Sequence, residues 1–408
     1  MSPRTDPAAP GAPTETPAPA PPPAPAAPPP PVTPPVPLPA DYLHFAGACD
    51  PGGDTVTIAA VGDILLHHEL QIQAFAHRDR HRVLWSGVED LLRRADLTYG
   101  NLEGPTAPGL DREGNEVADP GLVFDRVVYT AYPRFNFHPS VVEDLVLSGF
   151  DVVSTANNHA LDRRALGVDR TIAALRGARL AYTGTRAQAE PTAPWHAVTE
   201  ARGLRIAWLA CTELLNVRPD AHGQVLRCKD PALLTALRAL RRDPSIDAII
   251  LTPHWGKEYE PEPRPAQREL ARRWADAGAD AILGSHPHVL QPWEKLAAED
   301  GREVLVHYSL GNFASHQPEL PKRSTVVLYL ALRRDPASGR TRLAGVGYVP
   351  LHVRQSGDEF FVEAIDRVGG PAESRAHTLA IYGAPNLLAP DAPLALAPHC
   401  DPTWRPPA

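Results

Sequence analysis

Five short runs of apolar and β-branched residues, separated by stretches with helical spacing, constrain the fold of this 408-residue chain more than any other feature. Such runs are typical of strands buried on both faces, as in a parallel sheet that helices cover. Between them, apolar side chains recur every three or four residues, which predicts helices. The pattern indicates an α/β fold, with strands at residues 54–61, 96–101, 150–155, 246–252 and 280–283.

Weaker signals complete the predicted domain. Ser86-x-x-Glu89 predicts a helix that begins with a capping box. Pro265 and Gly278 mark the two ends of another predicted helix. Residues 106–134 are rich in Gly, Pro and charge and predict a long loop, which inside a compact domain is usually functional or disordered. Further along the chain we expect an antiparallel face, with strands at 325–332, 343–353 and 360–365.

A polar side chain suited to metal binding follows each of the five strands. Because open α/β sheets bind ligands at the carboxyl ends of their strands, we expect these side chains to converge on one edge of one sheet. A single His-x-His pair in a loop is more often solvated than bound to metal, but agreement at five strand ends favours a shared site. Imidazole, carboxylate and amide groups together suit Mn²⁺, Fe or Zn²⁺. The candidate ligands are Asp63, Glu103, Asn158, His254, His286 and His288, with His159 beside them.

The composition argues against two classes of protein. A net charge of −8 disfavours a nucleic-acid-binding surface as the main function. No stretch approaches the roughly 18 uninterrupted apolar residues that a membrane-spanning helix needs. With 43% hydrophobic residues, the chain can instead bury a sizeable core.

The first forty residues differ from the rest, because eighteen of them are proline. Such a segment is a semi-rigid extended spacer, and it lacks the charged start and apolar core of a signal peptide. Two interpretations stay open: a tether for an exported domain of the cell envelope, with the true start upstream or a signal removed, and a disordered cytoplasmic tail. We expect a linker at 1–40, one domain at 50–368, and an Ala/Pro-rich extension at 369–408 that wraps the surface.

The four cysteines allow three disulfide pairings. Cys49 and Cys400 flank the folded region, whereas Cys211 and Cys228 are close in sequence. We favour a Cys49–Cys400 disulfide that joins the termini and a Cys211–Cys228 disulfide that closes a loop. Disulfides would indicate an oxidising compartment, and four reduced thiols are the alternative.

Six motifs occur in order along residues 55–353: Val61-Gly-Asp63, Asn101-Leu-Glu103-Gly-Pro, Ala156-Asn-Asn-His-Ala-Leu-Asp162, His254-Trp-Gly-x-Glu-Tyr259, Gly284-Ser-His-Pro-His288 and Ser309-Leu-Gly-Asn-Phe313. In sequence and in order they resemble the motifs of the CapA family of capsule-synthesis (poly-γ-glutamate synthesis) proteins. That family is similar in turn to the calcineurin-like metallophosphoesterases. The resemblance implies a four-layer α/β/β/α sandwich with a two-metal site at its strand ends.

The resemblance also implies a role for each candidate ligand. The bridging position between two ions falls to Glu103, where the phosphoesterases have an aspartate. The first ion takes Asp63 and His288 in addition, and the second takes Asn158, His254 and His286.

Residues beside the implied ligands receive roles in the same way. His159 corresponds to a general acid, and Asp162, one helical turn later, is placed to orient its ring. Asn101, Glu258 and Asn312 belong to family motifs but have no clear phosphoesterase counterpart, so we expect them to contact substrate or support the ligands.

Two departures from the phosphoesterase pattern bear on the chemistry. Leu65 stands where those enzymes have a histidine two residues after the first aspartate, and the bridging group is the longer Glu103. His67 or His68 would have to reach back to supply the absent imidazole, but we expect the helix after Asp63 to carry both away. The two metal positions should therefore be unequal.

Two functions of different classes follow from these expectations. The first is a metal-dependent hydrolase of the cell envelope that acts on a phosphoester or on an amide of a glutamyl polymer. The second is a non-catalytic binding or export component of capsule assembly, which would hold an anionic polymer without turning it over. Either would take an anionic capsular polymer or phosphoester as its ligand and work with other capsule-assembly proteins. His159 and Asp162 favour catalysis, and Leu65 favours binding.

Overall fold

Fourteen strands and the helices around them account for the regular structure of the described residues. The computed structural model describes residues 42–50, 52–336 and 338–405, all within one compact unit. The strands are β1 (Thr55–Ile64), β2 (Leu97–Leu102), β3 (Val152–Ser154), β4 (Ala181–Thr183), β5 (His196–Ala201), β6 (Leu204–Thr212), β7 (Ala248–His254), β8 (Ala281–Leu283), β9 (Leu290–Ala297), β10 (Glu303–Leu310), β11 (Asn312–Ala314), β12 (Ser324–Arg334), β13 (Thr341–Ser356) and β14 (Glu359–Ala364).

The α-helices lie mostly between these strands in the sequence. They are α1 (His68–Ala76), α2 (Glu89–Leu92), α3 (Ser140–Leu147), α4 (Arg164–Ala178), α5 (Pro231–Arg242), α6 (Pro265–Ala277), α7 (Leu320–Arg323), α8 (Ile365–Val368) and α9 (Ala372–Tyr382). Short 3₁₀ helices span Arg80–Leu84, Ser86–Val88 and Pro398–Cys400.

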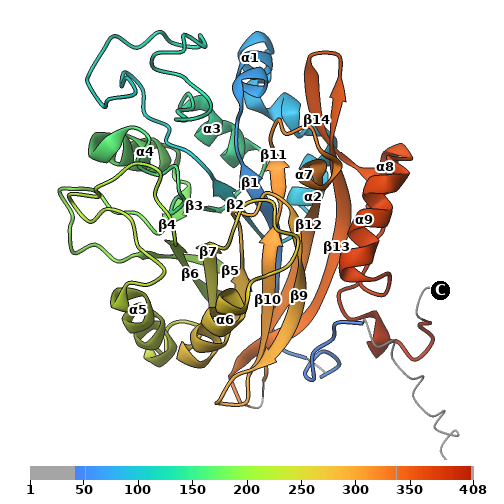
Figure 1. The fold of residues 1–408 in the computed structure, drawn as a ribbon. Coiled ribbons are helices and arrows are strands. Elements are labelled where there is room, and N and C mark those ends of the chain that lie inside the picture. The colour runs from blue at the N-terminus through green and yellow to red at the C-terminus, as the bar shows by residue number, and fades with distance from the viewer. Residues whose placement is uncertain (1–41, 51, 337, 406–408) are drawn as a thin grey trace, which may run out of the picture. The chain divides into compact units, whose positions relative to one another are not determined.

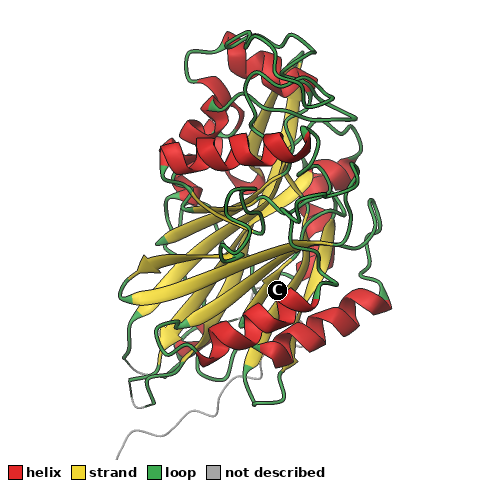
Figure 2. Ribbon diagram, turned by 90° about the vertical axis from the view of Figure 1, so that its left-hand side faces the viewer, coloured by secondary structure: helices red, strands yellow, loops and turns green. Residues whose placement is uncertain are grey.

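The strands form two sheets. The eight-stranded sheet has the order β14-β13-β12-β1-β2-β3-β4, with β11 paired to β1, and the six-stranded sheet has the order β5-β6-β7-β8-β10-β9. Strands β1 to β4 are parallel, as are β6, β7, β8 and β10. Figures 1 and 2 show the two sheets stacked with helices outside them. The predicted four-layer α/β/β/α sandwich and the antiparallel face of β12, β13 and β14 are confirmed.

Apolar side chains fill the three spaces between the four layers of this sandwich. Between the sheets, the Tyr99 ring stacks on Trp208 at 5.4 Å between ring centroids. Outside the eight-stranded sheet, Trp85 and Leu145 belong to a core that includes α1, α2 and α3. Outside the six-stranded sheet, Trp274 of α6 packs among residues of α5 and β7. Because both faces of each central strand are buried, those strands read as continuous apolar runs in the sequence.

Most predicted elements agree with the structure, but the capping box is wrong. Ser86 donates through its hydroxyl to the Val83 carbonyl oxygen, and the segment forms a 3₁₀ turn followed by the short helix α2. Both carboxylate oxygens of Glu89 instead accept hydrogen bonds from the guanidinium of Arg82, at 2.7 and 2.8 Å. Arg82, seven residues earlier, thus binds the Glu89 carboxylate in place of the backbone N–H of a capping box. The four-residue motif alone does not show this competing partner.

The termini of the described region are tied together. Both predicted disulfides, Cys49–Cys400 and Cys211–Cys228, are present. The segment after residue 368 does more than cover the surface, because it includes helix α9. Tyr382 at the end of that helix is buried, with its ring 5.0 Å from Trp293 of β9. The C-terminal residues therefore add to the core.

The predicted long loop lies between β2 and α3, and a buried arginine holds it. Arg163 donates to the carbonyl oxygens of Leu110, Val128 and Phe135, which are spread along the loop. Burial lowers the pKa of Arg163 to about 10, so its guanidinium stays charged at neutral pH. Within the part of the chain that the structure describes, no helix is both long and apolar enough to cross a bilayer.

Candidate metal centre

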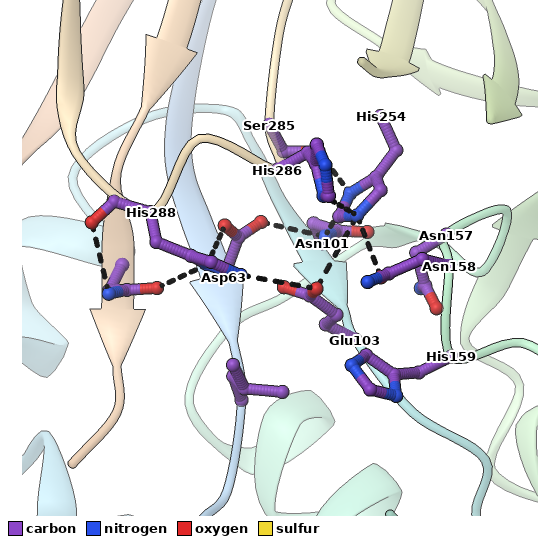
Figure 3. Close-up of polar contacts among 12 residues, drawn as sticks. Asp63, Asn101, Glu103, Asn157, Asn158, His159, His254, Ser285, His286 and His288 are labelled. Atoms are coloured by element: carbon purple, nitrogen blue, oxygen red, sulfur yellow. Dashed lines mark hydrogen bonds and ion pairs between the residues drawn. The ribbon is translucent and has the colours of Figure 1, made fainter. Parts of the chain in front are cut away.

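The predicted ligands come together at the carboxyl ends of strands from two sheets, so the expectation of one edge of one sheet is wrong. Strands β1, β2 and β3 of the eight-stranded sheet end near Asp63, Glu103 and Asn158. Strands β7 and β8 of the six-stranded sheet end at His254 and just before His286. The two stacked sheets bring these strand ends face to face, and Figure 3 shows Glu103 between the pair of His254 and His286 and the pair of Asp63 and His288.

Asp63 is held rigidly because it lies inside strand β1 rather than after it. Its backbone pairs with Asn312 of β11 and with Asn101 of β2, and its N–H donates to the Gly311 carbonyl oxygen at 2.9 Å. The close approach of these strands explains Gly62, where a Cβ atom would lie 1.9 Å from the same carbonyl oxygen. The Asp63 carboxylate is therefore fixed by backbone on both sides.

One group of side chains, which we call the His254 cluster, consists of Glu103, Asn158, His254 and His286. Around the His254 Nε2 atom lie Asn158 Oδ1 at 3.0 Å, His286 Nδ1 at 3.1 Å and Glu103 Oε1 at 3.4 Å. The other ring nitrogen of His254 faces the Ser285 hydroxyl at 3.0 Å. Four nitrogen and oxygen atoms thus converge on one place, as ligand atoms do around a bound cation.

The second group, the Asp63 cluster, consists of Asp63, Glu103 and His288. His288 Nδ1 lies 3.1 Å from Asp63 Oδ2 and 3.0 Å from Asn312 Oδ1. Because both neighbours are acceptors, the proton of the neutral ring belongs on Nδ1. This leaves the lone pair on Nε2, which lies 3.8 Å from Glu103 Oε1.

Glu103 is the strongest sign that these groups suit a metal. Both of its carboxylate oxygens are buried, and neither has a hydrogen-bond partner among the described residues. Burial raises its pKa well above the ordinary value, and the nearby charges of Asp63 and Glu258 raise it further. An unpaired buried carboxylate is costly unless a cation neutralises it. A cation shared by the two clusters would provide that neutralisation.

His254 and His286 have the protonation state that metal binding requires. Burial, followed by repulsion from neighbouring imidazoles, lowers the pKa of His286 to about 3 and lowers that of His254 well below its ordinary value. Both rings are therefore neutral at physiological pH, and only neutral imidazole can ligate. His286 and His288 also have positive φ angles, 98° and 58°. Such strain in non-glycine residues is concentrated at functional sites.

His159 lies beside the His254 cluster and is oriented by Asp162. Its Nδ1 atom is 2.7 Å from Asp162 Oδ2, which also accepts the backbone N–H of Phe135 at 2.7 Å. The Phe135 ring packs edge-on against His159 at 4.7 Å. On the other side of the imidazole, Nε2 lies 3.4 Å from the Asn216 side-chain nitrogen. Asp162 thus fixes the ring with Nε2 turned away from it.

The three remaining predicted residues lie around the clusters. Asn101 donates to Asp63 Oδ1 at 2.7 Å, and Asn312 contacts His288. Glu258 offers an oxygen near His286 and His288 and forms a third group of potential ligands with them. Asn101 and Asn312 therefore each contact a candidate metal ligand and support its position.

Two neighbours of the site were missed by sequence reasoning. Ser285 faces His254, and Asn216 approaches His159 from the loop after β6. Ser285 lies inside the quoted Gly284–His288 motif, so its place between two strand ends was a usable signal. Asn216 had none, because nothing around it in the sequence points toward the site.

Leu65 leaves the Asp63 cluster without a further imidazole. Its side chain is buried in the apolar core. His67 turns its Nδ1 toward the Leu65 carbonyl oxygen at 3.0 Å, and His68 begins helix α1. Neither histidine belongs to a group of potential metal ligands among the residues that the structure describes. The buried ligands of the Asp63 cluster are therefore Asp63, His288 and the shared Glu103, and Glu258 lies near His288.

Comparison with known proteins agrees with the motifs. The chain is 27% identical over 333 residues to the capsule biosynthesis protein CapA of Bacillus anthracis, covering 77% of this chain and 71% of that protein. It is 26% identical over 294 residues to the PGA biosynthesis protein CapA of Bacillus subtilis, covering 69% of each chain. Among solved structures, the 5'-nucleotidase of Candida albicans is 12% identical, with a TM-score of 0.35, over 73% of this chain and 52% of that one.

The family model described as bacterial capsule synthesis protein PGA_cap matches residues 57–317, a range that includes every candidate ligand. Since this match spans more than half of the sequence, the chain belongs to the bacterial capsule synthesis protein PGA_cap family.

Proposed function

We propose that this protein is a metal-dependent hydrolase of capsular polymer metabolism. One observation carries the proposal: His159, held by Asp162, stands beside a buried set of potential metal ligands. A protein that only binds a polymer has no need of a positioned proton donor. Family membership supports a role in capsule synthesis, and the relatives include a probable polyglutamine synthesis accessory protein of Mycobacterium tuberculosis.

The donor set fits two divalent cations that share Glu103. The His254 cluster would hold one ion and the Asp63 cluster the other, and mixed nitrogen and oxygen ligands suit Mn²⁺, Fe or Zn²⁺. When bound, such ions would act as Lewis acids on an oxyanion and supply a nucleophilic water at neutral pH.

The chain itself would supply the proton. Asp162 accepts the Nδ1 hydrogen of His159 and would stabilise the imidazolium form of the ring. His159 Nε2 can then carry a proton to a leaving group, and the Phe135 N–H keeps the Asp162 carboxylate in place. In this arrangement His159 would transfer the proton and Asp162 would orient its ring, and neither role requires the backbone to move.

The substrate that we propose is an anionic polymer, with the amide of a γ-glutamyl chain preferred over a phosphoester. The names of the relatives point to capsule and poly-glutamate synthesis. Work on such a polymer would also bring the protein into contact with other capsule-assembly proteins.

A binding or export component is the second candidate, and Leu65 favours it. An apolar side chain at this position weakens the Asp63 cluster as a metal site. In this case the His254 cluster would anchor an anionic polymer that is not cleaved.

A hydrolysis assay separates the two candidates. The purified chain, supplied with Mn²⁺, is incubated with a panel of phosphoesters and γ-glutamyl peptides, and His159→Ala is assayed in parallel. The hydrolase proposal expects turnover of at least one class that the variant loses. Binding of γ-glutamyl peptides without turnover, equal in both proteins, would support the binding component instead.

We also propose that the domain works outside the cytoplasm, in the cell envelope. Its two disulfides support this, because such bonds persist mainly in oxidising compartments. Non-reducing mass spectrometry of protein from its native compartment should show the linked peptides of Cys49 and Cys400. Free thiols at both positions would contradict the proposed location.

A further inference from the structure

Three side chains form a polar rim beside the Asp63 cluster: Tyr259, Gln317 and Lys322. The ring of Tyr259 lies 6.1 Å from that of His288, and its backbone N–H donates to the Pro287 carbonyl oxygen at 2.8 Å. Tyr259 has a positive φ angle of 66°, a conformation that its surroundings must impose. The rim is thus fastened to the turn that carries His288.

Asn312 fastens the other end of the rim to the same histidine. Its side-chain nitrogen lies 3.0 Å from the Lys322 carbonyl oxygen and 3.2 Å from the His288 carbonyl oxygen. It also lies 3.0 Å from Gln317 Oε1. One amide group therefore sets the position of the rim relative to the Asp63 cluster.

Lys322 and Tyr259 contact each other in the rim. The Lys322 ammonium lies 3.8 Å from the centre of the Tyr259 ring, a distance at which cation and ring attract. The Gln317 side-chain nitrogen lies 3.5 Å from the Tyr259 hydroxyl oxygen, and the hydroxyl interacts with the Glu258 side chain. The group that the rim offers to an anion is therefore the Lys322 ammonium, which the Tyr259 ring holds in place.

The Lys322 ammonium already forms an ion pair with the carboxylate of Glu319. Glu319 Oε2 lies 3.0 Å from Lys322 Nζ, and the glutamate side chain is 56% exposed whereas that of Lys322 is 17% exposed. Ion pairs with one exposed partner contribute little to stability, so an incoming carboxylate can replace Glu319 at small cost. The group seen against Lys322 is the same group that a glutamyl polymer repeats along its length.

We infer that Lys322 and Tyr259 form a carboxylate subsite, which takes the free α-carboxylate of a γ-linked glutamyl unit next to the unit at the metal centre. This inference rests on the proposed function, because it deepens the choice of a glutamyl polymer as ligand. The subsite sets which chain binds and in which direction, while the two clusters and His159 act on the bond.

A binding experiment tests the subsite without relying on turnover. The chain loaded with Mn²⁺ is titrated by calorimetry with a γ-linked glutamate pentamer and with an isosteric pentamer whose α-carboxylates are carboxamides. We expect Lys322→Met to weaken binding of the glutamate pentamer about tenfold, as for loss of one charge-assisted hydrogen bond. Binding of the carboxamide pentamer should be weaker and insensitive to the substitution. Lys257→Met, at an exposed lysine paired with Glu260, is the matched control.

Two further variants distinguish loss of the subsite from misfolding of Lys322→Met. Lys322→Arg should retain most of the affinity, and Glu319→Gln should raise affinity for the glutamate pentamer alone, because it removes the competing carboxylate. The inference is overturned if Lys322→Met binds the glutamate pentamer as tightly as the parent, or if both pentamers lose affinity equally. It is also overturned if the parent does not prefer the glutamate pentamer. Absence of hydrolysis would contradict the proposed function and leave these binding results intact.

Discussion

The two ligand clusters share Glu103 but differ in what else they contain. The His254 cluster adds Asn158, His254 and His286, whereas the Asp63 cluster adds Asp63 and His288. Metal sites with a full set of protein ligands retain their ion, and sites with fewer leave positions for water or substrate. If both clusters bind metal as we propose, the His254 cluster would retain its ion and the Asp63 cluster would leave access for water or substrate.

The surroundings of the clusters reinforce this contrast. His159 and Asp162 stand on the side of the His254 cluster: His159 directly follows Asn158 in the chain, and Asp162 holds its ring. The Asp63 cluster is flanked by the buried Leu65 and by the exposed Tyr259. On the proposed function, the proton donor lies beside the His254 cluster and the polar rim lies beside the Asp63 cluster, which would make the site directional.

The largest effect should come from the proton donor. We expect His159→Ala to reduce turnover by about 10²- to 10⁴-fold, the range typical of a lost general acid. Its metal content should stay that of the parent, because no ligand is removed. Elemental analysis beside the kinetics checks both points. Loss of metal from this variant would show that His159 is a metal ligand rather than a proton donor. The proposed functional difference between the two clusters would then be wrong.

Adding a ligand to the weaker cluster should sharpen the comparison. Leu65→His places an imidazole two residues after Asp63, and we expect it to tighten the second ion about 10- to 100-fold, which titration with Mn²⁺ measures. Leu65→Met has a similar volume without an imidazole and is the control. Equal affinities in the two variants would show that the side chain at this position does not reach the cluster.

Lowering the pH should reduce the free energy of unfolding by a smaller amount. Metal loss can be interpreted only in the pH range in which the chain stays folded. His307 is fully buried, neither ring nitrogen has a hydrogen-bond partner among the described residues, and burial lowers its pKa to about 3. The unfolded chain takes up this proton near pH 6.5 and the folded chain only near pH 3, so stability falls as the pH drops through that window. At pH 4.5 the loss should be about 2 to 3 kcal/mol.

Denaturant unfolding across this pH window checks the acid effect. His307→Leu should flatten the pH dependence, whereas His77→Leu, at an exposed histidine, should keep the dependence of the parent. An unchanged slope in His307→Leu would assign the acid sensitivity to other buried groups. Metal removal experiments should then stay above the pH at which the parent begins to unfold.

The strands that carry the site could be predicted because burial on both faces leaves a local signal. Residues 248–251 and 281–283 are apolar without interruption, and both segments lie in central strands. Strand β9 has no such signal, since it lies at an edge and mixes Trp293 with Glu294 and Lys295. Edge strands bury one face only, and the pattern in the sequence weakens accordingly.

The meeting of two sheets could not be predicted from local patterns. The runs before Asp63 and before His254 look alike in sequence, yet they belong to different sheets. Membership of a sheet depends on pairing between distant strands, which the order of residues along one strand does not encode. The same holds for Asn216, which reaches His159 only because the loop after β6 folds back.

Metal content after dialysis tests the inequality of the two clusters most directly. Elemental analysis of the dialysed parent should find about one ion per chain, with a second taken up only in excess metal. Asp63→Ala should keep the tight ion, because the His254 cluster is intact, and His286→Ala should lose it. Two equally tight ions in the parent, with equal losses in both variants, would contradict the asymmetry and show that another group completes the Asp63 cluster.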